Sequence, residues 1–151
     1  MFQLEEVSLP EGLKTISWMA FYQCEALEKI AFPKGLESIG AGAFHECKAL
    51  EEILLPEGVK SIGSSAFAKC ANLKKVVLPK GLQEIGSLAF YECSSLEEVW
   101  IPESVKEIGE HAFSGGFTLK ETRLYGAPGS RAETYARENK HKFNVFNIKP
   151  R

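Results

Sequence analysis

Apolar residues recur along this chain every 23 positions, with polar residues filling the intervals between them. Three columns of this kind are evident: leucines, then valines or isoleucines three positions later, then isoleucines near the centre of each unit. They contain Leu4, Leu27, Leu50, Leu73, Leu96 and Leu119; Val7, Ile30, Ile53, Val76 and Val99; and Ile16, Ile39, Ile62, Ile85 and Ile108. The spacing between the six leucines is constant, without insertion or deletion. A period of this length predicts a solenoid, because one unit cannot bury its apolar face without its neighbours.

Each unit predicts a short strand followed by two tighter segments. The Val/Ile position and the residue two positions later face the core, while the residue between them faces outward, as a half-buried strand requires. A proline then ends the strand, since it cannot donate a ladder hydrogen bond; these prolines are Pro10, Pro33, Pro56, Pro79 and Pro102. The closing Ala-Phe-x-x-Cys segment is predicted to be a tight helical or 3₁₀ turn whose phenylalanine fills the interior.

The unit L-x-x-[VI]-x-[LIF]-P followed by I-G-x-x-A-F-x-x-C resembles the BspA-type (Treponema-type) leucine-rich repeats of bacterial and protist proteins. The resemblance covers residues 4 to about 124. It implies an α/β-type repeat solenoid, a right-handed coil with a parallel β-sheet on its concave face and short turns or 3₁₀ segments elsewhere. The asparagine ladder of general leucine-rich repeats is missing, and the prolines occupy that turn. We expect a single domain, 1–151, with repeats 4–26, 27–49, 50–72, 73–95 and 96–118, then a partial sixth repeat and cap over 119–151.

The C-terminal part of the chain predicts a helix-strand cap. Ser130 and Glu133 have the capping-box spacing of a helix start, and Ala132 and Tyr135 would share one side of that helix. The segment KFNVFNI, residues 142–148, alternates in a way that suggests a last strand. The preceding GAPGS, 126–130, is interpreted as a cap turn, with an anion site as the alternative.

Composition narrows the classes of function. The net charge is -2 and the pI about 6.0, which gives no basic surface for nucleic acid. All twenty acidic residues are glutamates, so neither an aspartate-containing triad nor an aspartate-rich calcium loop can form. No apolar run approaches the ~20 residues of a membrane helix, and MFQLEEVSLP lacks a secretory pattern, so we expect no membrane insertion and no signal peptide in this chain.

Cysteines and histidines are predicted to be structural. Cys24, Cys47, Cys70 and Cys93 share the 23-residue period, which favours buried thiols over a disulfide or a metal site, and Gly116 takes the fifth place in their column. His45, His111 and His141 occupy three different positions of the repeat and are interpreted as solvated surface residues. We therefore predict no cofactor, no metal and no enzymatic activity, since no nucleophile, base and orienting group come together in the pattern.

The N-terminal end of the solenoid leaves two interpretations open. Only three residues precede Leu4, and Ser17-Trp18-Met19 breaks the repeat pattern. Either Phe2, Trp18 and Met19 fold over the exposed end as a lid, or upstream repeats or a second copy of the chain cover it through these residues.

The outward-facing strand position is the candidate binding surface. Read along the solenoid it is Ser8, Ala31, Leu54, Val77, Trp100 and Arg123, with Lys74 and Lys75 among the flanking charges. An apolar column inside a charged border suits a protein interface, although β-branched and aromatic residues also simply favour strands. The leading hypothesis is a non-enzymatic protein-binding or adhesion module; the alternative is a spacer within a longer bacterial surface solenoid. The family resemblance favours a secreted or cell-surface location and a partner such as a host matrix or cell-surface protein.

Overall fold

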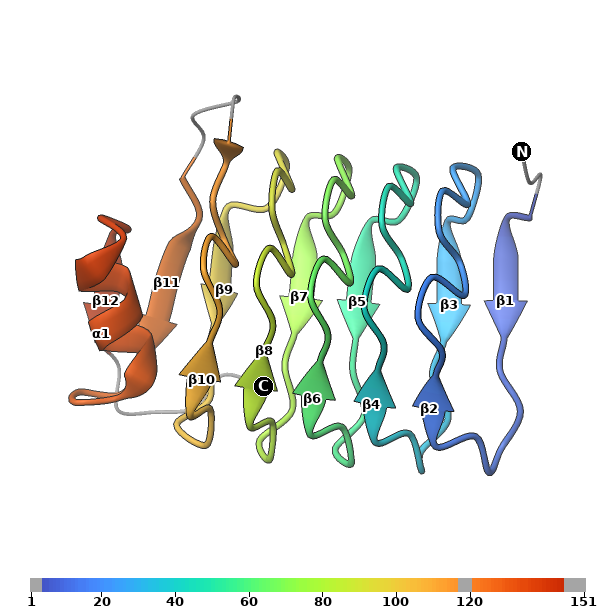
Figure 1. Ribbon diagram of the computed structural model, residues 1–151, viewed down its shortest axis with the longest axis horizontal. Helices are drawn as coiled ribbons and strands as arrows, with labels where there is room; N and C mark the ends of the chain where they lie inside the picture. The colour runs from blue at the N-terminus through green and yellow to red at the C-terminus, as the bar shows by residue number, and fades with distance from the viewer. Residues whose placement is uncertain (1–3, 117–120, 146–151) are drawn as a thin grey trace.

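The computed structural model describes residues 4–116 and 121–145. It is a solenoid of about six turns in which each coil contributes strands to two rows (Figure 1). The first row contains β1 (Glu6–Ser8), β3 (Lys29–Ala31), β5 (Glu52–Leu54), β7 (Lys75–Val77), β9 (Glu98–Trp100) and β11 (Arg123–Gly126). The second row contains β2 (Thr15–Ile16), β4 (Ser38–Ile39), β6 (Ser61–Ile62), β8 (Glu84–Ile85) and β10 (Glu107–Ile108). The predicted parallel-strand repeat solenoid is confirmed.

The strands pair in parallel with equivalent strands of neighbouring coils, without a break in the second row and in separate groups in the first. The second row is a continuous five-stranded sheet, in which Ile16, Ile39, Ile62 and Ile85 follow one another in register. The first row is hydrogen-bonded in three groups: β1 with β3, β5 with β7, and β9 with β11 and β12 (Phe143–Val145). Each first-row strand ends just before the apolar residue and proline that follow it, as the proline pattern predicts.

The Ala-Phe-x-x-Cys segment is a chain of i to i+3 turns, and the helical alternative is wrong for it. Ala20 N donates to Ser17 O (3.2 Å) and Cys24 N to Phe21 O (3.1 Å), but Met19 and Gln23 have φ of 54° and 56°. Residues in the left-handed backbone conformation interrupt the helical path. The N–H groups that are left without a partner within the turn donate to carbonyl oxygens of the next coil instead. Phe21 N donates to Ala43 O at 2.7 Å, and the same bond recurs from Phe44 to Ala66. These turns therefore form a third ladder between coils.

Phenylalanines from the turns form one stacked column through the core. The ring centroids of Phe21, Phe44, Phe67, Phe90 and Phe113 are 5.2, 5.2, 5.3 and 5.3 Å apart in that order, with interplanar angles of at most 10°. Separations longer than a face-to-face contact mean that the rings are offset, which is a favoured aromatic geometry. The column spans the first five coils and joins them into one core.

The C-terminal cap covers the end of this column. In α1 (Arg131–Glu138), Ser130 is the N-cap and its side chain accepts from Glu133 N, as predicted. Tyr135 packs edge-on against Phe113 at 6.1 Å, and its hydroxyl accepts a hydrogen bond from Phe113 N at 3.2 Å. Ala132 and Tyr135 are both buried, and β12 pairs in parallel with β11, so the predicted helix and last strand are present. Phe146 and Ile148 lie outside the described residues.

Two residues are added between the fifth and sixth first-row strands. Register places Arg123 opposite Glu98, Leu124 opposite Val99 and Tyr125 opposite Trp100, a step of 25 residues instead of 23. The prediction of an uninterrupted period across the sixth unit is therefore wrong. Leu119, its expected next leucine, lies outside the described residues.

Candidate binding surface

The outward positions of the first row form a mainly apolar stripe. Leu54 and Val77 are 49% and 38% exposed, Ala31 is exposed and Trp100 is half-buried. Because strand side chains alternate, these residues point away from the core that Ile53, Val76 and Val99 fill. We use the name apolar stripe for Ala31, Leu54, Val77, Trp100 and Tyr125.

Tyr125, and not Arg123, is the sixth member of this column. The longer step before β11 puts Tyr125 beside Trp100, and the two rings stack with centroids 4.1 Å apart and an interplanar angle of 13°. The placement of Arg123 in the column is thus corrected: it lies one pleat away, opposite Glu98, and its guanidinium donates to Asn144 Oδ1 at 2.6 Å. The sequence carried no signal for Tyr125, because the period assigns it to another position.

Exposed charges flank the stripe. Lys74 and Lys75 are exposed as predicted, and their backbone N–H groups both donate to Glu51 O in the preceding coil. In the pleat beside the stripe, register sets Glu6 opposite Lys29 and Glu52 opposite Lys75. Opposite charges facing each other across neighbouring strands stabilise a sheet by roughly 0.2–1 kcal/mol per pair.

The cysteine column is part of the packing. All four thiols are free and buried, as predicted. Cys47, Cys70 and Cys93 each donate Sγ–H to the carbonyl oxygen of a phenylalanine in the preceding coil, at 3.1 Å. Burial raises the pKa of Cys47 and of Cys93 to about 12, and raises that of Cys70 well above its usual range. Thiols held in their neutral form are poor nucleophiles and metal ligands.

We expect the free energy of unfolding to fall as the pH rises from about 9 toward 12. The unfolded chain releases its thiol protons near their ordinary pKa of 9.0, whereas the folded chain keeps them until about 12. Stability from these thiols is therefore complete below the unfolded pKa and is lost as the pH climbs toward the folded one. Urea unfolding at a series of pH values measures the slope. Cys93→Ala should flatten it, and a variant with the unchanged slope would contradict this account.

Two of the three histidines are wrongly predicted to be solvated. His111 is exposed, but His45 is half-buried and stacks on Tyr22 at 5.2 Å. His141 is also half-buried, stacks on Tyr135 at 5.6 Å, and its Nδ1 lies 2.9 Å from Thr122 O. Since a carbonyl only accepts, Nδ1 is the donor of this hydrogen bond. Both rings have structural partners.

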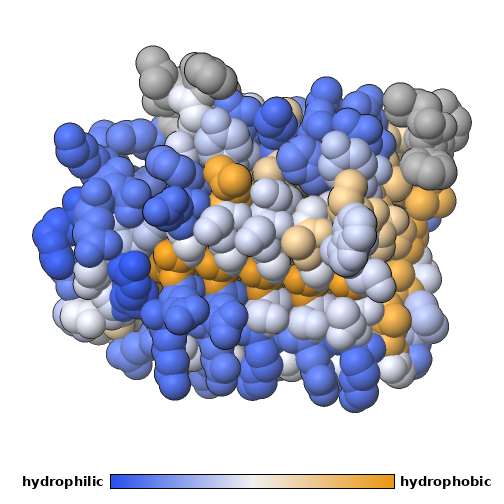
Figure 2. All heavy atoms as spheres, in the orientation of Figure 1, coloured by the Kyte–Doolittle hydropathy of each residue, from blue (hydrophilic) through white to orange (hydrophobic). Residues whose placement is uncertain are grey.

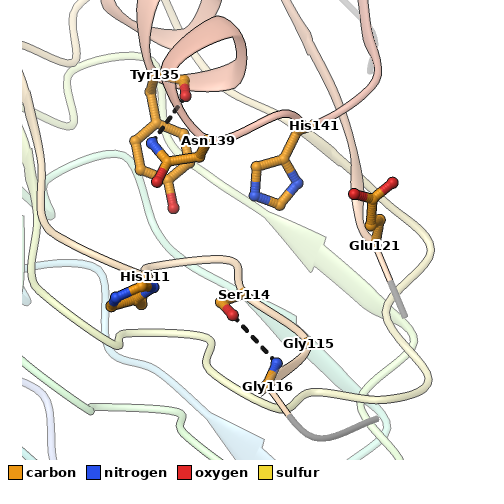
Figure 3. A pocket seen from close by; sticks show the side chains of 8 residues that line it. All are labelled: His111, Ser114, Gly115, Gly116, Glu121, Tyr135, Asn139 and His141. Carbon is orange, nitrogen blue, oxygen red and sulfur yellow. Dashed lines mark hydrogen bonds between the residues drawn. The ribbon is translucent and has the colours of Figure 1, made fainter. Parts of the chain in front are cut away.

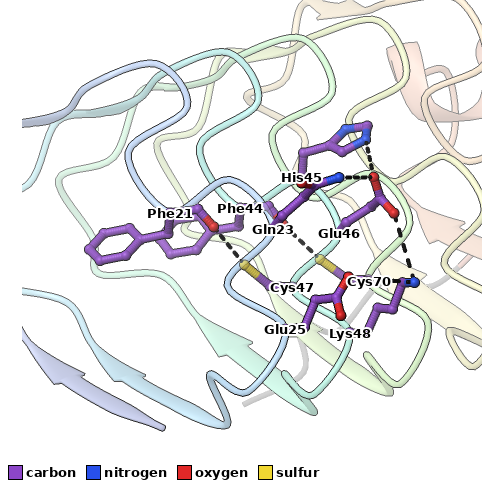
Figure 4. A network of polar contacts seen from close by, with 9 residues as sticks. All are labelled: Phe21, Gln23, Glu25, Phe44, His45, Glu46, Cys47, Lys48 and Cys70. Carbon is purple, nitrogen blue, oxygen red and sulfur yellow. Dashed lines mark hydrogen bonds and ion pairs between the residues drawn. The ribbon is translucent and has the colours of Figure 1, made fainter. Parts of the chain in front are cut away.

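A polar cluster surrounds Glu46 on the turn ladder (Figure 4). Gln23 Nε2 donates to Glu46 Oε1 at 3.0 Å, His45 Nε2 lies 3.4 Å from the same oxygen, and Lys48 bridges Glu46 and Glu25 at 3.8 Å each. The hydrogen bond from Gln23, aided by the nearby positive charges, lowers the pKa of the Glu46 carboxyl. The cluster links the first two coils.

A pocket of about 310 Å³ lies where the fifth coil meets the cap (Figure 3). Its lining residues are His111, Ser114, Gly115, Gly116, Glu121, Tyr135, Asn139 and His141. Side-chain hydrogen bonds join residues that line this pocket. Ser114 Oγ accepts from Gly116 N at 3.1 Å, and Asn139 donates to Tyr135 O at 2.9 Å. Among the described residues, no three histidine, cysteine or acidic side chains are placed to hold a metal ion.

The N-terminal end presents apolar surface (Figure 2). Leu4 and Met19 are each 40% exposed and Trp18 is 70% exposed. Met19 Cγ lies toward Gly42 of the second coil, so neither Trp18 nor Met19 forms the predicted lid. Phe2 lies outside the described residues.

Ser17 makes a further coil at this end unfavourable. In the next four coils the same position is glycine, and a Cβ there would lie 2.6 Å from Trp18 N at Gly40 or from Ala41 N at Gly63. Those atoms belong to the preceding coil. Ser17 has such a Cβ and is exposed, so a coil stacked on this end in the same geometry would collide with it.

The described helix is not long and apolar enough to cross a membrane.

The stacked coils, the capping helix α1 and the exposed strand face define a leucine-rich repeat solenoid. The chain belongs to the family of BspA type leucine rich repeat proteins, whose model matches six copies over residues 1–120. This confirms the resemblance seen in the repeat unit. The family commonly serves in protein interaction and at cell surfaces, and its fold is typically non-enzymatic.

Solved bacterial structures share the fold. The leucine-rich repeat protein of T. pallidum (TpLRR) is 36% identical over 82% of this chain, with a TM-score of 0.75. A leucine-rich cell surface protein of Faecalibacterium prausnitzii is 33% identical over 80% of this chain (TM-score 0.71), and the pneumococcal vaccine antigen PcpA 31% over 83% (TM-score 0.70). This chain spans 59%, 33% and 31% of those three proteins. A comparison with curated proteins finds no match.

Proposed function

We propose that this protein is a non-enzymatic binding module that presents the apolar stripe to a protein partner. The observation that carries the proposal is the exposure of Leu54 and Val77 beside the stacked Trp100–Tyr125 pair, between charged columns. At protein interfaces, the residues that contribute most of the binding energy are commonly large side chains surrounded by a polar rim. Ala31 at one end and Arg123, Lys74 and Lys75 at the border complete the proposed contact surface.

The proposed partner is a protein outside the cell. The similarity to a cell surface protein of F. prausnitzii and to a pneumococcal vaccine antigen supports a surface or secreted location for this chain. A host matrix or cell-surface protein is the class of partner that this location offers. Membership of a family that commonly mediates protein interaction supports binding, and not catalysis, as the role of the solenoid.

A structural spacer, the second candidate, has an observation against it. A spacer would need coils stacked on both ends, and Ser17 blocks the N-terminal end in the geometry that the other coils use. The cap of α1 and β12 covers the other end. The stripe is the better candidate.

Leu54→Glu/Trp100→Glu is expected to weaken binding of a matrix or cell-surface partner by at least about 30-fold, the loss of a ~2 kcal/mol hot spot. Pull-down from host-cell lysate and matrix proteins, followed by titration of the retained protein, measures this. Asn72→Glu/Gln83→Glu is the matched control, because both positions are exposed and lie away from the stripe. Circular dichroism should show that all variants fold. Equal retention by native and stripe variant would overturn the proposal.

A further inference from the structure

The charges beside the stripe change sign from coil to coil. One flanking column lies on the strands themselves, and the other follows the prolines. They contain Glu6, Lys29, Glu52, Lys75, Glu98 and Arg123, and Glu11, Lys34, Glu57, Lys80 and Glu103. In each of the first five coils both flanks have the same sign, and the next coil has the opposite one. All of these side chains are exposed except the half-buried Arg123.

The outward side chains of the stripe column increase in size along the solenoid. Ser8 and Ala31 are small, Leu54 and Val77 are intermediate, and Trp100 with Tyr125 form an aromatic pair. The corrected register extends both patterns to the sixth coil, since it moves Arg123 into the charged column and Tyr125 into the stripe column.

The alternating charges and the increasing side-chain size both fit a second copy of the same face in one orientation. A twofold axis in the interface, parallel to the strands and between coils three and four, places coil one on coil six, two on five and three on four. Glu52 then faces Lys75 of the other copy, and Lys29 faces Glu98. Ala31 faces Trp100, Ser8 faces Tyr125, and Leu54 faces Val77, so that small residues meet large ones as a packed interface requires.

Other twofold arrangements of this face are unfavourable. An axis along the solenoid would place each coil on its own equivalent, with glutamate facing glutamate and lysine facing lysine. Reversed arrangements centred on a coil also pair like charges, because the sign alternates. Like charges placed together across an interface suppress the wrong arrangement. In the favoured arrangement one pair of like charges remains, Glu28 facing Glu97 in the next column outward. This pair lies at the solvated rim, where the interaction energy between charges is small.

We propose that this protein forms a twofold homodimer through the apolar stripe, with coil order reversed between the copies. The proposal rests on the proposed function, in that it names a second copy as a protein partner of the same face. Six coils at ~4.8 Å and six residues at ~3.3 Å give a face of roughly 570 Å² per copy. The pair would bury about 1,100 Å², near the lower limit for a specific interface, so the dimer is weak, with a dissociation constant on the order of 10 µM.

Analytical ultracentrifugation from about 1 to 200 µM tests the dimer, because association depends on concentration by mass action. The native chain should dimerise, and Lys75→Glu and Glu52→Lys should each associate at least about tenfold more weakly. An equimolar mixture of the two variants should recover dimer, since each of the two contacts then sets a glutamate of the Lys75→Glu chain against a lysine of the Glu52→Lys chain. Each variant has lost the same opposite-charge neighbour within its own fold, so recovery on mixing reports a contact between chains.

Leu54→Glu provides the second arm of the test. It should abolish the native dimer and also prevent recovery when it is added to both charge variants. A native chain that is monomeric at about 200 µM, a dimer that Leu54→Glu leaves intact, or a mixture that fails to recover would each overturn the dimer. The proposed function is judged separately: a captured partner lost by Leu54→Glu/Trp100→Glu but kept by Asn72→Glu/Gln83→Glu supports it even when the native chain is monomeric.

Discussion

Phe67→Ala is expected to destabilise the fold by about 3–5 kcal/mol, the usual cost of removing a buried phenylalanine. The Phe67 ring is fully buried and stacks on Phe44 at 5.2 Å and on Phe90 at 5.3 Å, so its loss leaves a cavity between two coils. The backbone ladders on either side hold the coils at their spacing and limit collapse into that cavity. Urea unfolding followed by circular dichroism measures the change.

Phe21→Ala is the matched control within the same column. Phe21 is only partly buried and has a single ring neighbour in the column, Phe44 at 5.2 Å, so the same deletion should cost less than about 2 kcal/mol. Since the coils share one core, loss at the third coil should lower the unfolding midpoint of the whole chain. Equal costs at the two positions would mean that the column is not the main source of cohesion between coils.

Gly86→Ala is expected to cost about 3 kcal/mol through steric conflict between coils. A Cβ at Gly86 would lie 2.5 Å from Ser64 N and 2.7 Å from Gly63 C, and both atoms belong to the backbone of the preceding coil. Backbone held by the second-row ladder cannot move aside without breaking the hydrogen bond from Gly86 N to Ile62 O (2.8 Å). Thermal unfolding measures the loss.

Gly35→Ala serves as the control, and we expect it to change stability by no more than about 0.5 kcal/mol. A Cβ at Gly35 would meet only the flexible end of Lys14, 3.4 Å away. A similar loss for both substitutions would show that glycine is needed for backbone freedom and not for the close approach of the coils.

Core positions could be predicted from the chain because their chemistry repeats. Ile39, Ile62 and Ile85 recur every 23 residues. They fill the same buried space in successive coils, so the same residue type is found at the same interval. The buried thiols follow for the same reason. Local signals sufficed at the C-terminus too, since Ser130 and Glu133 form their hydrogen bond within one helical turn.

Contacts between coils carry no such local signal. The purpose of the repeated glycines became clear only when their positions were seen to lie against the backbone of the preceding coil. The thiol bonds from Cys70 to Phe44 O and from Cys93 to Phe67 O join residues 26 apart, three more than the period. His141 pairs with Thr122 O across the cap, a contact that depends on how the helix docks.

Repeat period, core columns and capping helix were thus written in the sequence, because each depends on the pattern of burial or on neighbours a few residues away. The membership of the candidate binding surface was not. Two added residues before β11 exchange Arg123 for Tyr125 in the stripe column, and a strict period cannot anticipate a change in strand register. A shift of register moves every later side chain to a new neighbour, and that change creates the stacked aromatic pair and adds Arg123 to the alternating charges.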